Sequence, residues 1–87
     1  MSRQTHIKVR SSKWGPTVVV DDYELFDYLD DIFTDKGLRF VYLPEAIDGQ
    51  GRVYSFLFPV VVDLNFLRMI VDGIDESEVE RIWRLNN

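Results

Sequence analysis

Carboxylates are the side chains of this sequence best suited to chemistry, and they are concentrated in one stretch. Residues 20–37 carry seven of the fifteen acidic residues of the 87-residue chain, and Asp30 and Asp31 follow Asp27 by about one helical turn. Such a group could coordinate a hard cation or carry out acid–base catalysis. A calcium site, however, requires a flexible loop with about six to eight oxygen ligands, and a catalytic carboxylate requires burial. We therefore expect neither a metal site nor a catalytic carboxylate.

Histidine, cysteine and glycine give no second catalytic pattern. His6, the sole histidine, falls on the outward face of a predicted edge strand, where we expect it to be exposed and without a nucleophile to activate. The absence of cysteine excludes disulfides, thiolate catalysis and cysteine-rich zinc modules. Gly49 and Gly51 lie between two predicted strands, whereas a phosphate-binding loop must open a helix. We expect a protein that is not an enzyme and that holds no cofactor.

The acidic stretch carries the local signals of an α-helix at both of its ends. Asp21 can cap the first turn, and Glu24, three residues later, can complete a capping box. Val20 and Leu25 occupy the two positions of a hydrophobic staple, and Gly37 follows where helices commonly end. The pattern predicts a helix that begins at Asp21 and ends before Gly37.

The helical period divides this helix into an apolar face and an acidic face. The apolar stripe spans about 120°, wide enough to pack on a core, and consists of Leu25, Phe26, Leu29, Ile32 and Phe33. Like charges one turn apart on the opposite side destabilise the helix by about 0.2–0.5 kcal/mol per pair, which mixed charges would avoid. A solvated face kept for solubility is the alternative. We predict a partner-binding face formed by Tyr23, Glu24, Asp27, Asp30, Asp31 and Asp35.

The remaining segments predict one small α+β domain over residues 1–87, with 1–4 as a loose tail. Alternation and turn residues predict an antiparallel sheet of about four strands, at 5–11, 16–20, 38–43 and 52–58, with a loop at 44–51. The acidic helix is expected to pack across one face of this sheet. Two short C-terminal helices complete the expected order, β-β-α-β-β-α-α.

The C-terminal helices and the core follow from the same kind of pattern. Asp63 can cap a helix over 63–71, although a strand at 66–71 is the alternative for this short apolar run. Asp75 can cap the last helix, with Glu78 as its box partner. The predicted core is one cluster of Leu25, Leu29, Ile32, Phe33, Phe40, Phe56 and Phe58.

Charge is distributed unevenly along the chain. The net charge is −5 and the sequence pI is about 4.6, yet residues 1–20 carry four cations and no acid. The longest apolar run near the middle, 56–62, is far shorter than the roughly 20 residues of a membrane span. No apolar leader segment precedes the first strand, so we expect a soluble cytoplasmic protein that does not enter a membrane.

These observations favour protein binding, through the acidic helix, to a basic surface of a nuclease or nucleic-acid-binding protein. In charge and size the helix resembles the nucleic-acid mimics among small phage-encoded inhibitors, such as anti-CRISPR proteins, and immunity proteins that neutralise nuclease toxins. A nucleic-acid-binding module is the first alternative, using Arg3, His6, Lys8, Arg10, Lys13 and Trp14. The acidic pI argues against this direct nucleic-acid binding. A self-associating structural domain, for example a homodimer, is the second alternative.

Overall fold

An antiparallel sheet of five short strands and three helices form an α+β fold in the computed structural model, which describes residues 6–48 and 51–86. The elements in chain order are β1 (Ile7–Arg10), β2 (Thr17–Val20), α1 (Tyr23–Asp35), β3 (Val41–Tyr42), β4 (Ala46–Asp48), β5 (Gly51–Leu57), α2 (Leu64–Asp72) and α3 (Glu76–Asn86). The predicted class is confirmed, and the predicted order holds apart from the additional strand β4. The predicted tail at 1–4 and residues 49–50 of the predicted loop at 44–51 lie outside the described residues.

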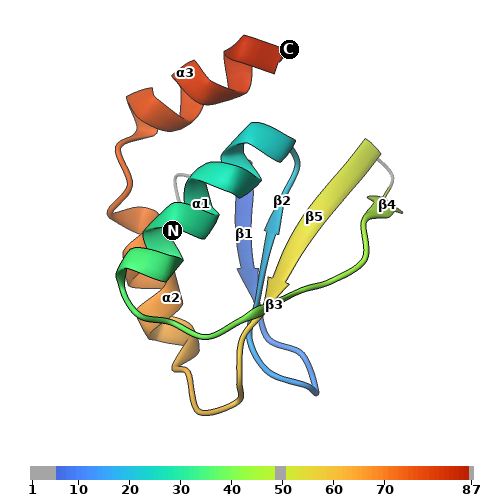
Figure 1. Ribbon diagram of the computed structural model, residues 1–87, viewed down its shortest axis with the longest axis vertical. Helices are drawn as coiled ribbons and strands as arrows, with labels where there is room; N and C mark the ends of the chain where they lie inside the picture. The colour runs from blue at the N-terminus through green and yellow to red at the C-terminus, as the bar shows by residue number, and fades with distance from the viewer. Residues whose placement is uncertain (1–5, 49–50, 87) are drawn as a thin grey trace.

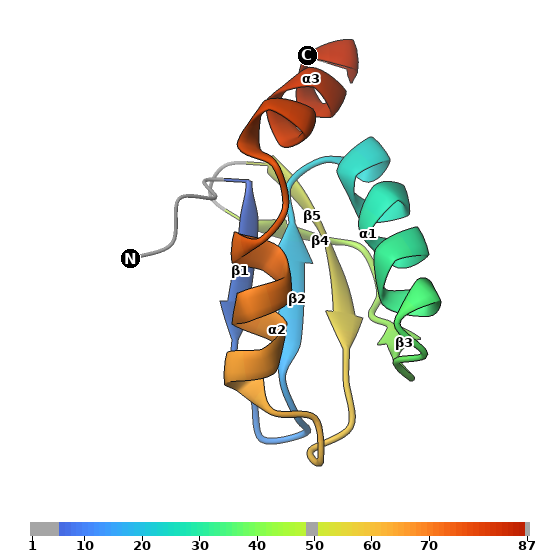
Figure 2. The same ribbon diagram turned by 90° about the vertical axis from the view of Figure 1, so that its left-hand side faces the viewer.

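The strand order places β5 at the centre of the sheet. Neighbouring strands follow the order β1-β2-β5-β3, β4 pairs with the start of β5, and every pairing is antiparallel. Helices α1 and α2 lie on the same face of the sheet, α1 against β2 and β5 and α2 against β1 (Figures 1 and 2). Helix α3 lies beyond one end of the strands and contacts α1 (Figure 1). No helix of the described chain crosses the opposite face.

The third predicted strand is shorter than expected, and the predicted loop after it contains a strand. Pairing with β5 covers only Val41 and Tyr42, followed by a hydrogen bond from the Leu43 N–H to the Ser55 carbonyl. Pro44 has no N–H to donate and interrupts the ladder. Pairing resumes at β4, so one edge of the sheet is divided into two short strands.

The N-cap of helix α1 lies one residue later than predicted, and the helix itself begins at Tyr23. The carboxylate of Asp22, not that of Asp21, caps the helix by accepting from the Leu25 N–H at 3.1 Å. Asp21 still continues the β1–β2 ladder, because its N–H donates to the His6 carbonyl. The shift also removes Glu24 from the position of a capping-box partner. At the other end, Gly37 adopts φ +73°, as predicted for a helix exit.

The core lies between the helices and one face of the sheet. Five of the seven predicted core residues are fully buried, namely Leu25, Leu29, Phe33, Phe56 and Phe58. Ile32 and Phe40 are only half-buried and pack against this cluster. Phe40 lies in the connection after α1 rather than in a strand, and its ring contacts the edges of the buried phenylalanines.

Both C-terminal helices form where the capping residues predict them. Asp63 accepts from the Asn65 N–H, and α2 buries two side chains, so the helix prediction is confirmed over the strand alternative. Asp75 accepts from the Ser77 N–H at the start of α3. Glu78 is not its box partner, because its carboxylate binds Arg81 instead.

Candidate protein-binding face

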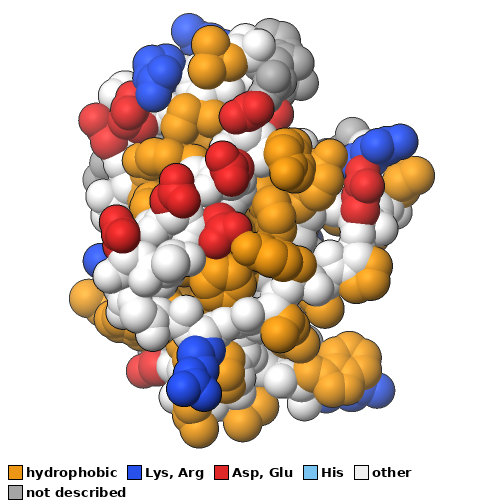
Figure 3. Space-filling model, in the orientation of Figure 1, with side chains coloured by type: hydrophobic (Ala, Val, Ile, Leu, Met, Phe, Trp, Pro, Cys, Tyr) orange, Lys and Arg blue, Asp and Glu red, His pale blue; other side chains and the backbone are white. Residues whose placement is uncertain are grey.

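Four carboxylates form a line along the exposed side of α1, which we term the acidic ridge: Glu24, Asp27, Asp31 and Asp35. The steps of three, four and four residues keep them on one side of the helix over about 16 Å. All four are exposed, and in the part of the chain that the structure describes they enter no ion pair and accept no side-chain hydrogen bond. Figure 3 shows acidic side chains gathered over α1. The ridge therefore lacks internal neutralisation.

An aromatic strip lies beside the acidic ridge, between α1 and the strands. It consists of Tyr23 and Phe26 from α1, Tyr42 from β3 and Tyr54 from β5. Tyr23 and Tyr42 are 59% and 57% exposed, whereas Phe26 stacks on the buried Phe56 ring at 4.3 Å. The ring of Tyr54 lies 5.5 Å from that of Tyr23 and 5.7 Å from that of Phe26. The contact with the core holds the exposed rings in place, and Figure 3 shows apolar side chains running alongside the carboxylates.

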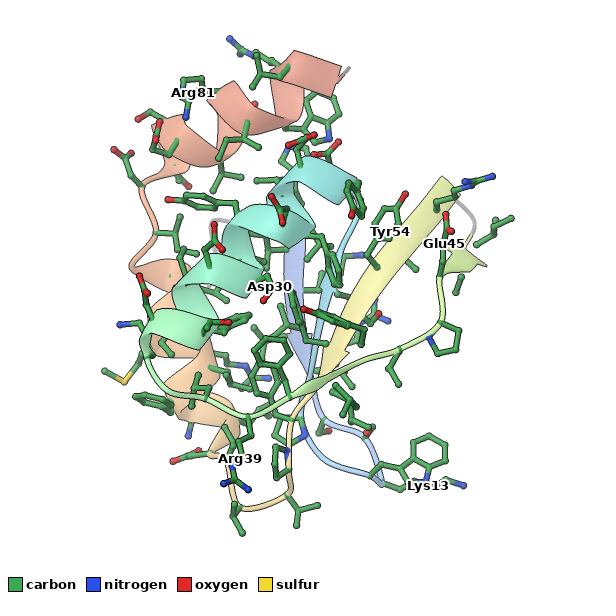
Figure 4. The ribbon with its side chains drawn as sticks, viewed as in Figure 1. Lys13, Asp30, Arg39, Glu45, Tyr54 and Arg81 are labelled. Atoms are coloured by element: carbon green, nitrogen blue, oxygen red, sulfur yellow. The ribbon has the colours of Figure 1, made fainter. Side chains whose placement is uncertain are left out.

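Asp30 differs from the ridge residues because it joins α1 to β3. It is half-buried, and its two oxygens accept hydrogen bonds from the hydroxyls of Tyr42 and Thr34. The Tyr42 hydrogen bond to this carboxylate raises the tyrosine pKa above its ordinary value of 10.0. Figure 4 shows Asp30 on the side of α1 that faces the sheet. Among the five predicted binding carboxylates, Asp30 is thus the one that accepts side-chain hydrogen bonds within the described residues.

Tyr23 lies at the margin of the acidic ridge rather than in its middle. Its ring leans toward Tyr54, on a strand 31 residues further along the chain. The sequence prediction included neither Tyr54 nor Tyr42 in the site. The alternation of β5 places Tyr54 on the same face as Phe56 and Phe58, which is the signal that could have identified it.

His6 is not the exposed surface residue that the sequence predicted. Its side chain is 14% exposed and stacks on the Trp83 ring at 4.7 Å. Nδ1 lies 3.1 Å from an Asp21 carboxylate oxygen, and Nε2 lies 3.3 Å from one of Glu80. His6 thus connects the start of β1 to the start of α1 and to α3.

The basic residues of the N-terminal segment are separated from His6. Lys8 and Arg10 are exposed on β1, on the face opposite the helices. Lys13 lies in the β1–β2 hairpin (Figure 4), with its ammonium 4.5 Å from the centre of the Trp14 ring. Arg3 lies outside the described residues. Lys8 and Arg10 therefore lie on the far side of the sheet from the acidic ridge, and Lys13 lies in the hairpin beyond the end of β1.

Two open grooves accompany these surfaces. The larger, of about 700 Å³, follows β3 and has Trp14, Arg39, Val41, Tyr42 and Leu57 among its lining residues. The smaller, of about 480 Å³, lies between α1 and α2. Among the described residues no cluster of three or more histidine or acidic side chains could hold a metal ion. None of the described helices is long and apolar enough to cross a membrane.

Comparisons with known proteins find no matching family model, no similar curated protein and no similar solved structure. The chemistry of the exposed faces is therefore the basis for a functional proposal.

Proposed function

We propose that this protein binds a basic surface of a nucleic-acid-handling protein through its acidic–aromatic face, which is the acidic ridge together with the aromatic strip. The proposal assigns it the role of an inhibitor or immunity-type protein. The observation that carries the proposal is a row of exposed carboxylates that have no ion-pair partner among the described residues and lie directly beside exposed aromatic rings.

The spacing of the ridge is compatible with partial imitation of a nucleic-acid strand. Four carboxylates over about 16 Å give one charge per roughly 5 Å of helix. A single DNA strand carries one charge per about 3.4 Å of its axis. The ridge is less dense than a strand but has the same sign and a similar linear form. A basic groove that binds phosphates would attract it and accelerate the encounter.

The aromatic strip supplies what a charged ridge alone lacks. Tyrosine is enriched among the residues that dominate binding energy at protein interfaces. Tyr23 and Tyr42 are exposed and supported by Phe26, so little side-chain freedom remains to be lost on binding. The carboxylates would steer and orient the partner, and the rings would supply buried apolar area.

Direct nucleic-acid binding by the basic strand has weaker support. The chain carries a net charge of −5, which repels phosphates at long range. His6, one of the residues assigned to that function, is already held by Asp21, Glu80 and Trp83. Trp14 is the one exposed aromatic side chain beside the described cations of β1 and its hairpin, so stacking of successive bases has little support.

A pair of charge-matched variants tests the proposal. The variant Asp27→Asn with Asp31→Asn removes two ridge carboxylates. The control, Glu45→Gln with Glu76→Gln, removes two exposed carboxylates from outside the ridge, so both variants change the net charge from −5 to −3. Partners are captured from a lysate of the source organism at physiological salt and identified by mass spectrometry. We expect basic nucleic-acid-binding proteins with the parent and the control, and at least tenfold less capture with the ridge variant.

Competition distinguishes nucleic-acid mimicry from generic charge attraction. A single-stranded oligonucleotide should displace the captured partner if the ridge occupies a nucleic-acid site. Equal capture by the ridge variant and the parent would refute the assignment of this face. Capture that depends on the ridge but resists the oligonucleotide would retain protein binding and reject mimicry.

A further inference from the structure

The sheet face opposite the helices is more apolar than a solvated face requires. Because Val18, Val20 and Phe56 are buried against the helices, the residues that alternate with them lie on the opposite side. These outward residues include five aliphatic side chains, Val19, Val41, Leu43, Val53 and Leu57. An antiparallel sheet with one face in water normally alternates apolar and polar residues. An aliphatic floor here indicates a face that another surface covers.

Cations border this floor along one edge. Lys8, Arg10 and Lys13 are exposed, and within the described chain none of them forms an ion pair. We term the aliphatic floor together with Lys8 and Arg10 the basic sheet face, and Lys13 and Trp14 lie at its end in the β1–β2 hairpin. In the part of the chain that the structure describes, this face is therefore positively charged and not neutralised by ion pairs, although the chain is acidic overall.

Trp14 is held in an exposed position by the backbone of its hairpin. Ser12 and Gly15 close the turn with two backbone hydrogen bonds of 3.1 and 3.2 Å. Gly15 has φ +135°, and a Cβ there would lie 2.1 Å from the Phe58 carbonyl oxygen, so the hairpin packs directly on the end of β5. The Trp14 side chain remains 66% exposed and lines the 700 Å³ groove, which passes along β3 from Tyr42 on the helix side to Val41 and Leu57 of the aliphatic floor. Tryptophan is enriched among the residues that dominate binding energy at interfaces, so an exposed tryptophan at this groove suits an interface anchor.

We infer that the basic sheet face binds the acidic–aromatic face of a second copy of this chain. The inference rests on the proposed function in one respect, that the acidic–aromatic face is a binding surface. Charge complementarity selects this occupant, because among residues 6–48 and 51–86 one face carries cations without ion pairs beside an aliphatic floor, and the other carries carboxylates without ion pairs beside tyrosines. Both lie on one molecule, so every copy supplies the surface that the other face requires.

The geometry determines the kind of assembly. The two faces lie on different sides of the sheet, so the contact is head-to-tail and leaves one free face of each kind on a pair of molecules. Such a contact grows into a ring or a filament rather than stopping at a symmetric dimer. The net charge of −5 opposes growth, and the attraction acts within a Debye length of about 8–10 Å. Association is accordingly weak, concentration-dependent and weakened by salt.

Sedimentation equilibrium of the full chain tests this inference, from 10 µM to about 500 µM in 50 mM and in 500 mM salt. We expect concentration-dependent association at low salt and at least a tenfold weaker association at high salt. Lys8→Gln with Arg10→Gln should weaken association about tenfold or more, and so should Asp27→Asn with Asp31→Asn. The control, Lys36→Gln with Arg68→Gln, removes two exposed cations elsewhere and should associate like the parent.

Mixing the two impaired variants gives the sharpest result. Each retains one intact face, so a 1:1 mixture should form a pair that cannot grow further. A monomeric parent at 500 µM in low salt would overturn the inference, as would association that the Lys8 and Arg10 substitutions leave unchanged. Oligonucleotide binding that these substitutions abolish, in a protein that stays monomeric, would assign the basic sheet face to nucleic acid instead.

The two proposals fail separately. Loss of self-association with ridge-dependent capture of a basic protein retained would reject the second copy and keep the proposed function. Self-association through the ridge, with capture unaffected by the Asp27 and Asp31 substitutions, would keep the second copy as the occupant and reject the proposed function.

Discussion

Helices α1 and α3 are both rich in acidic residues, but they differ in whether these residues form ion pairs. On α3, Glu78 binds Arg81 at 2.8 Å, and Glu80 lies within 4.0 Å of Arg84 and 3.3 Å of His6. On α1, the ridge carboxylates have no such partner among the described residues. The same chain thus forms mixed-charge pairs on one helix and omits them on the other. Solubility alone would not require this difference, which is why we associate α1 with an external partner.

The two helices also differ in what they contribute to the core. Helix α1 buries Leu25, Leu29 and Phe33 completely against the sheet. Helix α3 buries Val79 and most of Ile82, beyond the end of the strands, and is also held by polar contacts through His6. We therefore expect α1 to determine global stability and α3 to open more easily.

The largest predicted effect is the loss of stability when a buried side chain of α1, rather than of α3, is shortened. Leu29→Ala should lower the free energy of unfolding by about 2–5 kcal/mol, because it leaves a cavity under α1. Val79→Ala on α3 removes fewer atoms and should cost about half as much. Chemical denaturation followed by circular dichroism measures both. Equal losses would show that α3 is as integral to the core as α1.

The next effect concerns the attachment of α3 through His6. His6→Ala removes the stacking on Trp83 and both carboxylate contacts, and should cost about 1–2 kcal/mol. His6→Phe keeps a stacked ring and should recover part of that loss. Trp83 fluorescence reports the local environment and hydrogen exchange reports opening of α3. Unchanged exchange in α3 for His6→Ala would show that the helix is held by Val79 and Ile82 alone.

Removing carboxylate charge should raise the stability of the protein when it is done on α1 and lower it when it is done on α3. Asp27→Asn with Asp31→Asn relieves several like-charge pairs and should stabilise the protein by up to about 1 kcal/mol. Glu78→Gln should lower stability slightly, because the Arg81 hydrogen bond that lowers the Glu78 pKa is weakened. Thermal melts at low and high salt measure both changes, and salt should diminish each. Destabilisation by the α1 variant would mean that the ridge carboxylates serve the fold.

The smallest effect tests the hydrogen bond that joins α1 to β3. Because Asp30 raises the Tyr42 pKa, this contact stabilises the fold below about pH 10 and is lost as pH rises through the raised pKa. Tyr42→Phe should cost less than about 1 kcal/mol at pH 7, since Tyr42 is largely exposed. The difference from the parent should vanish at higher pH. Absorbance titration of Asp30→Asn provides the control, since Tyr42 should then ionise at lower pH than in the parent.

Local signals were sufficient to predict most helices and the main core residues. The caps at Asp63 and Asp75 and the exit at Gly37 each depend on residues within one turn. The helix cap at position 21 was wrong by one residue, because pairing of β2 with β1 extends through Asp21. The strand at 38–43 was too long for a related reason. Its pairing depends on β5 and on Pro44, and not on its own apolar pattern.

The sequence by itself determined the acidic ridge, because a period of 3.6 residues aligns positions 24, 27, 31 and 35 whatever surrounds the helix. Only the tertiary structure decided which side chains lie beside the acidic ridge. Tyr42 and Tyr54 join Tyr23 through strand pairing, and His6 meets Glu80 across 74 residues of chain. Strand pairing likewise shows which residues of β2, β3 and β5 share the outward face of the sheet. Side-chain periodicity is set within a few residues, whereas these contacts depend on how distant segments pack.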